Sequence, residues 1–220
     1  MAKLSLSKEG LKKALDVVTA TINNNSTVPI LRGIKFQIQD NVLAMYTNSI
    51  TAFSLSYLNV ESDDNFCFAV EGLLFADLIK RLRADKIELE IDKSNLVIKA
   101  EGFKTVLPVL EVDEFPDVPK IEGIEVKVNT DCFLRSINLT SLSCSREDMR
   151  PILKCIRFEG KDKNIIMTAL DGYRLATTNF SIKENVDEFA VNIPVVELIK
   201  VIKNIDEEKI ILNIDTKLDY

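Results

Sequence analysis

Lysine and arginine recur along the stretches of this chain that have helical periodicity, and such side chains can bind phosphate groups. These basic residues are Lys8, Lys12, Lys13, Lys80, Arg81, Arg83, Lys86, Arg135, Lys200 and Lys203. Contacts to phosphates position a nucleic-acid duplex without specifying its bases. The alternative is that each helix simply has a solvated face, and helix by helix this alternative is the stronger. Only the repetition of basic helices in an acidic chain favours binding to DNA.

Two shorter motifs also carry polar chemistry. The loop Ser143–Arg150 contains Arg146 and ends just before a proline. It could contact a phosphate backbone, or it could be an ordinary connection between a helix and a strand. The dipeptide Asp171-Gly172, within Ala169–Ala176, predicts a tight turn between two strands. From composition alone this turn is a hairpin and nothing more.

Enzymatic chemistry has little support in the sequence. The chain has no histidine, which excludes Ser-His-Asp, Cys-His and zinc-histidine sites. Four cysteines lack the C-x-x-C spacing of zinc and redox sites, and we expect reduced, mostly packed thiols. Glu88 and Glu90 alternate outward on a predicted strand, and no glycine-rich nucleotide loop is present. We therefore expect no catalytic residue, no metal and no cofactor.

The composition is that of a folded, acidic protein. Its 220 residues are 46% hydrophobic and 28% charged, with a formal net charge of −6 and a pI near 5.0. This length suits one large or two modest domains. No secretory signal is recognisable, and no run approaches the ~20 apolar residues that a bilayer requires. We expect a cytoplasmic protein.

An internal repeat organises the chain. The segment 29–36 (PILRGIKF) recurs 122 positions later as 151–158 (PILKCIRF). Three further matches follow in the same order, at offsets of 121, 120 and 123, and end with the pair Lys86–Asp92 and Lys209–Asp215. Collinear matches at a nearly constant offset indicate two copies of one module. A proline-containing stretch, 111–123, joins them.

Each copy is predicted to contain two β-α-β-β-β units. In the first copy the helices are expected at Lys8–Thr21, with Ser7 as N-cap, and at Gly72–Arg83. Alternating apolar and polar residues predict antiparallel strands that are solvated on one face. Expected strands lie at 3–6, 34–39, 42–47, 51–58, 66–70, 86–91, 95–100 and 103–109.

The second copy repeats this order but stops early. Its helices are expected at Asp131–Leu142 and Val195–Ile205, and its strands at 125–128, 154–159, 165–169, 174–180, 188–193 and 209–214. The fold class is therefore α+β, with tandem modules whose antiparallel sheets lie outside and whose helices lie inside. The second module is incomplete because the last strands of the first have no counterpart.

Several motifs resemble the bacterial DNA polymerase III beta subunit, or beta sliding clamp, family. Leu170–Ala176 (LDGYRLA), with Arg150–Leu153 upstream, is similar to the second domain of that family. Ser26–Gly33 and Glu114–Pro119 look like the matching parts of its first domain and linker. The resemblance implies a clamp domain at 1–123, including the linker 111–123, and a second at 124–220 that lacks its last strands. It also implies that the third clamp domain is absent.

The resemblance implies a DNA-clamp fold and a processivity factor without intrinsic catalysis. Such a factor tethers the replicative polymerase to duplex DNA and binds the linear motifs of the polymerase III alpha subunit, the clamp loader and repair polymerases. The implied peptide pocket consists of Leu153, Leu170, Gly172, Tyr173, Arg174 and Leu175. The implied DNA contacts are Lys12, Lys80, Arg83, Arg146, Lys200 and Lys203. Against the pocket stands the alternative that Leu153 and Leu175 are core residues.

The chain also departs from the family pattern. Tyr173 stands where the family commonly has histidine, Leu170 replaces a usual threonine, and Asn25 stands where arginine is frequent. Ring closure by self-association would need domains that this sequence lacks. Three hypotheses follow: a fragment of an ordinary clamp, a shortened clamp-like interaction module that does not encircle DNA, and, with least support, an unrelated enzyme on a similar scaffold.

Overall fold

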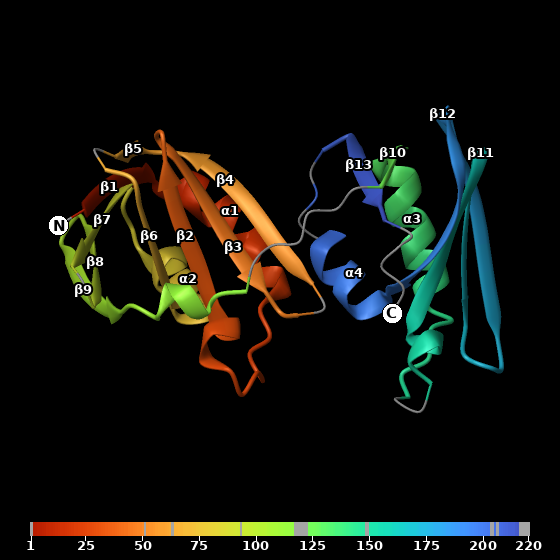
Figure 1. The fold of residues 1–220 in the computed structure, drawn as a ribbon, viewed down its shortest axis with the longest axis horizontal. Helices are drawn as coiled ribbons and strands as arrows, with labels where there is room; N and C mark the ends of the chain where they lie inside the picture. The colour runs from red at the N-terminus through yellow and green to blue at the C-terminus, as the bar shows by residue number, and fades with distance from the viewer. Residues whose placement is uncertain are drawn as a thin grey trace. The chain divides into compact units, whose positions relative to one another are not determined.

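The computed structural model describes residues 2–50, 52–62, 64–92, 94–116, 123–147, 150–202, 205 and 207–215. The chain divides into two compact units, Met1–Val118 and Pro119–Tyr220 (Figure 1). Within the described ranges, no helix is long and apolar enough to cross a membrane.

Unit 1 contains nine strands and two α-helices among its described residues. The first half consists of β1 (Ala2–Ser7), α1 (Lys8–Val18), β2 (Gly33–Gln39), β3 (Val42–Asn48) and β4 (Phe53–Asn59). The second half consists of β5 (Glu61–Ser62), β6 (Phe66–Glu71), α2 (Gly72–Arg81), β7 (Lys86–Asp92), β8 (Asn95–Ala100) and β9 (Phe103–Pro108). The two predicted β-α-β-β-β units are confirmed, and the short strand β5 was not foreseen.

The two halves of unit 1 exchange their first strands. Strand β1 pairs with β7 in a sheet of order β5-β1-β7-β8-β9, and β6 pairs with β2 in a sheet of order β4-β3-β2-β6. All of these pairings are antiparallel. Each sheet therefore contains strands from both halves, and neither half can complete its sheet alone.

Both helices of unit 1 begin directly after a strand, and the last residue of that strand is the N-cap. The Ser7 hydroxyl accepts a hydrogen bond from the Gly10 N–H, as predicted, and the Glu71 carboxylate accepts one from the Leu74 N–H at 2.7 Å. Such caps satisfy backbone donors that the first helical turn leaves unpaired. The α1 helix ends at Val18 and continues as a 3₁₀ turn, Thr19–Thr21, so the predicted end at Thr21 includes both.

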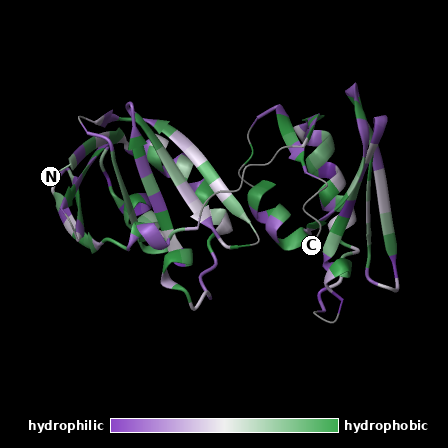
Figure 2. Cartoon of the chain, in the orientation of Figure 1, coloured by the Kyte–Doolittle hydropathy of each residue, from purple (hydrophilic) through white to green (hydrophobic). Residues whose placement is uncertain are grey.

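One hydrophobic core serves both sheets and both helices of unit 1. At its centre Phe36 stacks on Phe68 with ring centroids 4.7 Å apart, and Phe75 of α2 meets Phe36 edge-on at 5.2 Å. All three rings are almost fully buried. Alternating hydrophobic and hydrophilic bands along the strands are visible in Figure 2. The period-two alternation thus places one face of each strand against this core.

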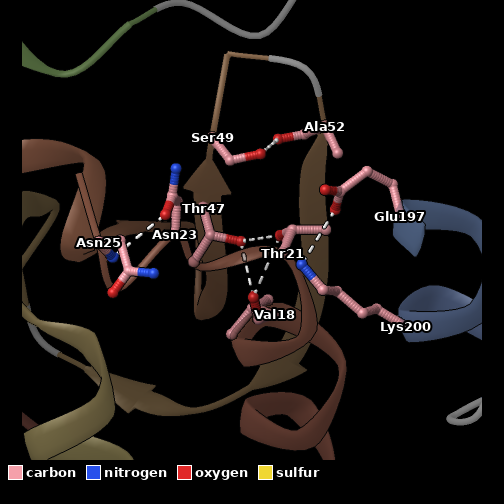
Figure 3. A network of polar contacts seen from close by, with 9 residues as sticks. All are labelled: Val18, Thr21, Asn23, Asn25, Thr47, Ser49, Ala52, Glu197 and Lys200. Atoms are coloured by element: carbon pink, nitrogen blue, oxygen red, sulfur yellow. Dashed lines mark hydrogen bonds and ion pairs between the residues drawn. The ribbon is translucent and has the colours of Figure 1, made fainter. Parts of the chain in front are cut away.

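A buried hydroxyl pair ties the end of α1 to β3 (Figure 3). The Thr21 and Thr47 hydroxyl oxygens lie 2.7 Å apart, and Thr47 donates to the Val18 carbonyl at 2.7 Å. Both threonines are nearly inaccessible to solvent. Because buried hydroxyls need partners, this network stabilises the exit of α1 towards the loop that contains Asn23 and Asn25.

Unit 2 repeats the plan with longer strands. Its elements are β10 (Ile124–Asn129), α3 (Thr130–Ser141), β11 (Cys155–Leu170), β12 (Leu175–Pro194), α4 (Val195–Ile202) and β13 (Lys209–Ile214). Strand β10 pairs with β13, and β11 pairs with β12. The prediction of four short strands between 154 and 193 was wrong, since the ladder continues through register shifts at 160–164 instead of breaking at the charged residues there.

The core of unit 2 is separate and lies between α3, α4 and the strands. Phe158 meets Phe133 edge-on at 6.0 Å and lies 5.4 Å from Phe189. The expectation of mostly packed thiols is only partly met: all four cysteines are free, but Cys67 and Cys132 are exposed. Cys67 lies on β6 and Cys132 on α3, each at a position that faces solvent and is not one of the apolar positions of its element.

The strand exchange creates a charged cluster on the outer face of unit 1. Glu90 of β7 lies 2.8 Å from the Lys3 Nζ of β1 and 2.7 Å from the Lys99 Nζ of β8. Hydrogen bonds from these two ammonium groups lower the pKa of Glu90 to about 2. Glu90 therefore stays ionised at neutral pH and pairs with residues of the two neighbouring strands.

This cluster makes the stability of unit 1 dependent on pH. Because the pKa of Glu90 is depressed in the folded state, its stabilising effect is complete above the ordinary carboxyl pKa near 4.5 and is lost as the pH falls towards about 2. Glu90→Gln should therefore lower the urea midpoint at pH 7 and have much less effect at pH 3. Glu88→Gln, on an exposed position of the same strand, is the control. An equal loss at both pH values would contradict this account.

Candidate functional site

The turn between β11 and β12 is held by one carboxylate. Asp171 Oδ1 accepts hydrogen bonds from the N–H groups of Tyr173 and Arg174, both at 3.0 Å, and Oδ2 accepts one from Arg174 Nε at 2.9 Å. These bonds, above all those from the two backbone N–H groups, lower the pKa of Asp171. Gly172 has φ +94°, a conformation that L-residues rarely adopt. The predicted tight turn is thus present, and it is organised by a side chain.

A loop from elsewhere in unit 2 lies against this turn. Tyr173 and Arg174 line a shallow depression of about 220 Å³ together with Asp171 and the loop residues Cys144, Ser145, Arg146 and Glu147. The loop is anchored because the Ser145 N–H donates to the Leu153 carbonyl at 2.8 Å. Burial raises the pKa of the Cys144 thiol to about 11, so that this side chain is a neutral thiol at pH 7.

Five of the six predicted pocket residues fall into three groups, and the sixth, Gly172, lies in the turn itself. Tyr173 and Arg174 line the depression, and the Tyr173 side chain is fully exposed. Leu170 and Leu175 lie opposite each other at the end of the β11–β12 ladder, with 40% and 62% of their surfaces exposed. Leu153 is half-buried in the 3₁₀ turn Pro151–Lys154. Leu175 is too exposed to be a core residue, and neither it nor Leu153 belongs to a hydrophobic core cluster among the described residues, so the alternative that they are core residues is wrong.

Sequence reasoning missed part of this site. It treated Ser143–Arg150 as a possible DNA contact, but the structure places Arg146 beside Tyr173 and Arg174. Ser145 and Glu147 line the same depression and were not singled out. The only signal in the sequence was that this loop immediately precedes the repeated Pro-Ile-Leu segment.

The basic residues of α1 and α2 are largely paired within unit 1. Lys80 Nζ lies 2.7 Å from Asp16 Oδ1, across the two helices. Lys13 and Arg81 pair with acidic residues one turn away on their own helices, at 3.2 and 2.9 Å. The predicted end of the second helix at Arg83 was wrong, since α2 ends at Arg81 and Arg83 lies just beyond it. Lys12 of α1 and Arg83 are exposed and make no ion pair in the part of the chain that the structure describes. These two carry the least compensated charge of the predicted contacts in unit 1.

Unit 2 offers fewer cations on its helices. Lys200 of α4 lies 3.4 Å from Glu197, and Lys203 lies outside the described residues. Arg135 of α3 is exposed, while Val196 and Val201 place apolar surface on α4. Among the described residues, the positive charge expected along the helices is therefore thinner in unit 2 than in unit 1.

The described ranges contain no cluster of three or more Cys, Asp or Glu side chains that could hold a metal ion. The arrangement at the β11–β12 turn suits binding of a peptide better than a reaction, since it combines exposed apolar side chains with a fixed arginine.

Comparison with known proteins assigns both halves of the chain. Residues 2–119 match the domain described as "DNA polymerase III beta subunit, N-terminal domain", and residues 127–218 match its "central domain". The beta sliding clamp of Bacillus subtilis is 26% identical over 224 residues, which cover 96% of this chain and 59% of that protein. The chain thus spans about three fifths of the length of this relative.

Solved structures give the same result at the level of fold. The DNA polymerase III beta subunit of Thermotoga maritima superposes with a TM-score of 0.89 at 22% identity, covering 98% of this chain and 60% of that one. A sliding clamp of Pseudomonas aeruginosa bound to griselimycin gives a TM-score of 0.90 at 20% identity, covering 96% and 59%. The expected α+β clamp fold is confirmed.

The turn geometry predicts a specific cost of substitution at Gly172. No atom lies within 4 Å of a methyl group added there, so Gly172→Ala should destabilise unit 2 through backbone strain alone, by about 1–2 kcal/mol. Urea denaturation measures this loss. Gly102→Ala, at φ +68° in the β8–β9 turn and equally free of neighbours, should strain unit 1 in the same way. An unchanged midpoint for Gly172→Ala would show that the turn relaxes to negative φ.

Proposed function

Because the chain belongs to the DNA polymerase III beta subunit family, we propose that it provides the first two domains of a sliding clamp that tethers a replicative DNA polymerase to duplex DNA. The family comprises non-catalytic accessory subunits of the polymerase. The observation that carries the proposal is the match of both halves, in the right order, to the N-terminal and central domains.

The helices of the two units are the proposed DNA-facing surface. Lys12 and Arg83 are exposed and unpaired among the described residues, and they are the best candidates for phosphate contacts. Lys80 and Lys200, also proposed as contacts, would have to exchange their carboxylate partners for phosphates. Binding is therefore expected to be weak and not sequence-specific, as suits a clamp that slides. We place this function in the cytoplasm, with the DNA.

The β11–β12 turn is the proposed docking site for partner peptides. Leu170 and Leu175 give exposed apolar area, Tyr173 adds an aromatic side chain, and Arg174 adds hydrogen-bond donors. Apolar anchors beside a few fixed polar groups are typical of sites that bind linear motifs. The proposed partners are the polymerase III alpha subunit, the clamp loader and repair polymerases. Encircling DNA would further require self-association with other clamp domains.

A second candidate function is an interaction module that binds clamp partners without encircling DNA. One observation favours it: the helices of unit 2 carry few unpaired cations within the described residues. Retention on circular DNA separates the two functions, because only a closed ring stays on a circle and slides off a linear end.

For the DNA-binding surface, Lys12→Glu combined with Arg83→Glu should weaken duplex association. Loss of two phosphate contacts should also reduce the magnitude of the slope of the logarithm of the association constant against the logarithm of the salt concentration by about two. The measurement is a salt titration with duplex DNA, alongside retention on circular and linear DNA. Lys104→Glu combined with Lys163→Glu, two exposed strand positions, is the matched control. An equal effect of both pairs would contradict the helix assignment.

For the peptide site, Leu170→Asp combined with Leu175→Asp should abolish binding of a peptide with the clamp-binding motif of a polymerase III alpha subunit. Both side chains are exposed, so the fold should survive. Fluorescence anisotropy measures the affinity, and circular dichroism checks the fold. Ile211→Asp, at a position of β13 that is 57% exposed, should bind the peptide like the unsubstituted protein. Retained binding by the double variant would show that the pocket lies elsewhere.

A further inference from the structure

We infer that Asp171 is a positioning residue of the peptide site, which holds Arg174 so that its guanidinium donates to a main-chain carbonyl of the bound peptide. The inference rests on the proposed function and assigns a role to a residue of the turn that carries the site. Asp171 is distinct from the pocket residues proposed above, since its carboxylate faces its own turn.

The geometry gives the carboxylate two separate tasks. Oδ1 accepts the backbone N–H groups of Tyr173 and Arg174, which sets the path of the turn. Oδ2 accepts Arg174 Nε at 2.9 Å, which sets the direction of the arginine side chain. The Asp171 side chain is only 16% exposed, whereas that of Arg174 is 64% exposed. The carboxylate is thus shielded from competing water and the guanidinium is available to a ligand.

Arg174 keeps most of its donors after this contact. A guanidinium has five N–H donors, and the contact with Asp171 uses the one on Nε. The four N–H groups on the two Nη atoms make no hydrogen bond among the described residues, and Arg174 lines the depression together with Tyr173 and residues 144–147. A long side chain that is already held loses less rotamer freedom when a peptide binds, so that fixing Arg174 strengthens binding.

The charges around the depression indicate which acceptor it takes. Arg146 and Arg174 line it, but so do Glu147 and Asp171. Two positive and two negative groups leave little net attraction for a carboxylate. A main-chain carbonyl of an extended peptide is neutral and accepts two N–H groups, and it is the acceptor that this arrangement fits.

Asp171→Asn separates the two tasks. The amide oxygen can still accept the Tyr173 and Arg174 N–H groups, but the amide nitrogen cannot accept from Arg174 Nε. We expect affinity for the polymerase-motif peptide to fall about tenfold in anisotropy titrations. Amide hydrogen exchange at Tyr173 and Arg174 should stay slow in this variant and accelerate in Asp171→Ala. Asp162→Asn, which removes one exposed negative charge from β11, should leave the affinity unchanged.

A double-mutant cycle identifies the route of the effect. In an Arg174→Ala background, Asp171→Asn should cause no further loss of affinity, because the residue that it positions is gone. An unchanged affinity of Asp171→Asn, or an equal loss with and without Arg174, would overturn the positioning role and leave the peptide site standing. Failure of the unsubstituted protein to bind the peptide would overturn the proposed function, and the positioning role with it.

Discussion

The exchange of first strands between the two halves of unit 1 is the constraint on which the rest of its structure depends. Strand β1 closes the sheet formed by the second half, and β6 closes the sheet formed by the first. Neither half can therefore bury its apolar face alone, and Phe36, Phe68 and Phe75 meet only when both are in place. The two helices start directly after these strands and are capped by Ser7 and Glu71, so the same pairing sets their positions. The charged helix surface is thus a consequence of how the sheets close.

The proposed peptide site depends on a smaller constraint of the same kind. A hairpin turn with positive φ at Gly172 places two exposed leucines at the end of a ladder, and one carboxylate fixes the polar side of that turn. The loop at residues 144–147 completes the depression because its backbone is tied to Leu153. The binding residues of the proposed site therefore lie in turns that rigid secondary structure holds in place. Such an arrangement suits the recognition of short peptides.

Charge pairing moderates the proposed DNA-facing role of the helices. Glu9, Asp16 and Asp77 each contact a basic residue on α1 or α2, which leaves few cations uncompensated in the described part of unit 1. Exposed pairs of this kind contribute little to stability, and their main effect is on the electrostatic field that a polyanion meets. A surface with modest positive charge is consistent with a protein that must stay on DNA without binding it tightly. It is equally consistent with an interaction module that does not encircle the duplex.

The sequence by itself determined the repeat, the α+β class, most helices and strands, the absence of histidine chemistry and the Asp171-Gly172 turn. These features are local, because helix and strand periodicities and turn preferences act over a few neighbouring residues. Only the tertiary structure decided that β1 and β6 exchange, that strands β11 and β12 run on past residues 160–164, that Lys80 is paired with Asp16, and that Arg146 belongs beside Tyr173 and Arg174. Each of these depends on residues far apart in the chain, whose proximity arises from packing and leaves no periodic signal in the sequence.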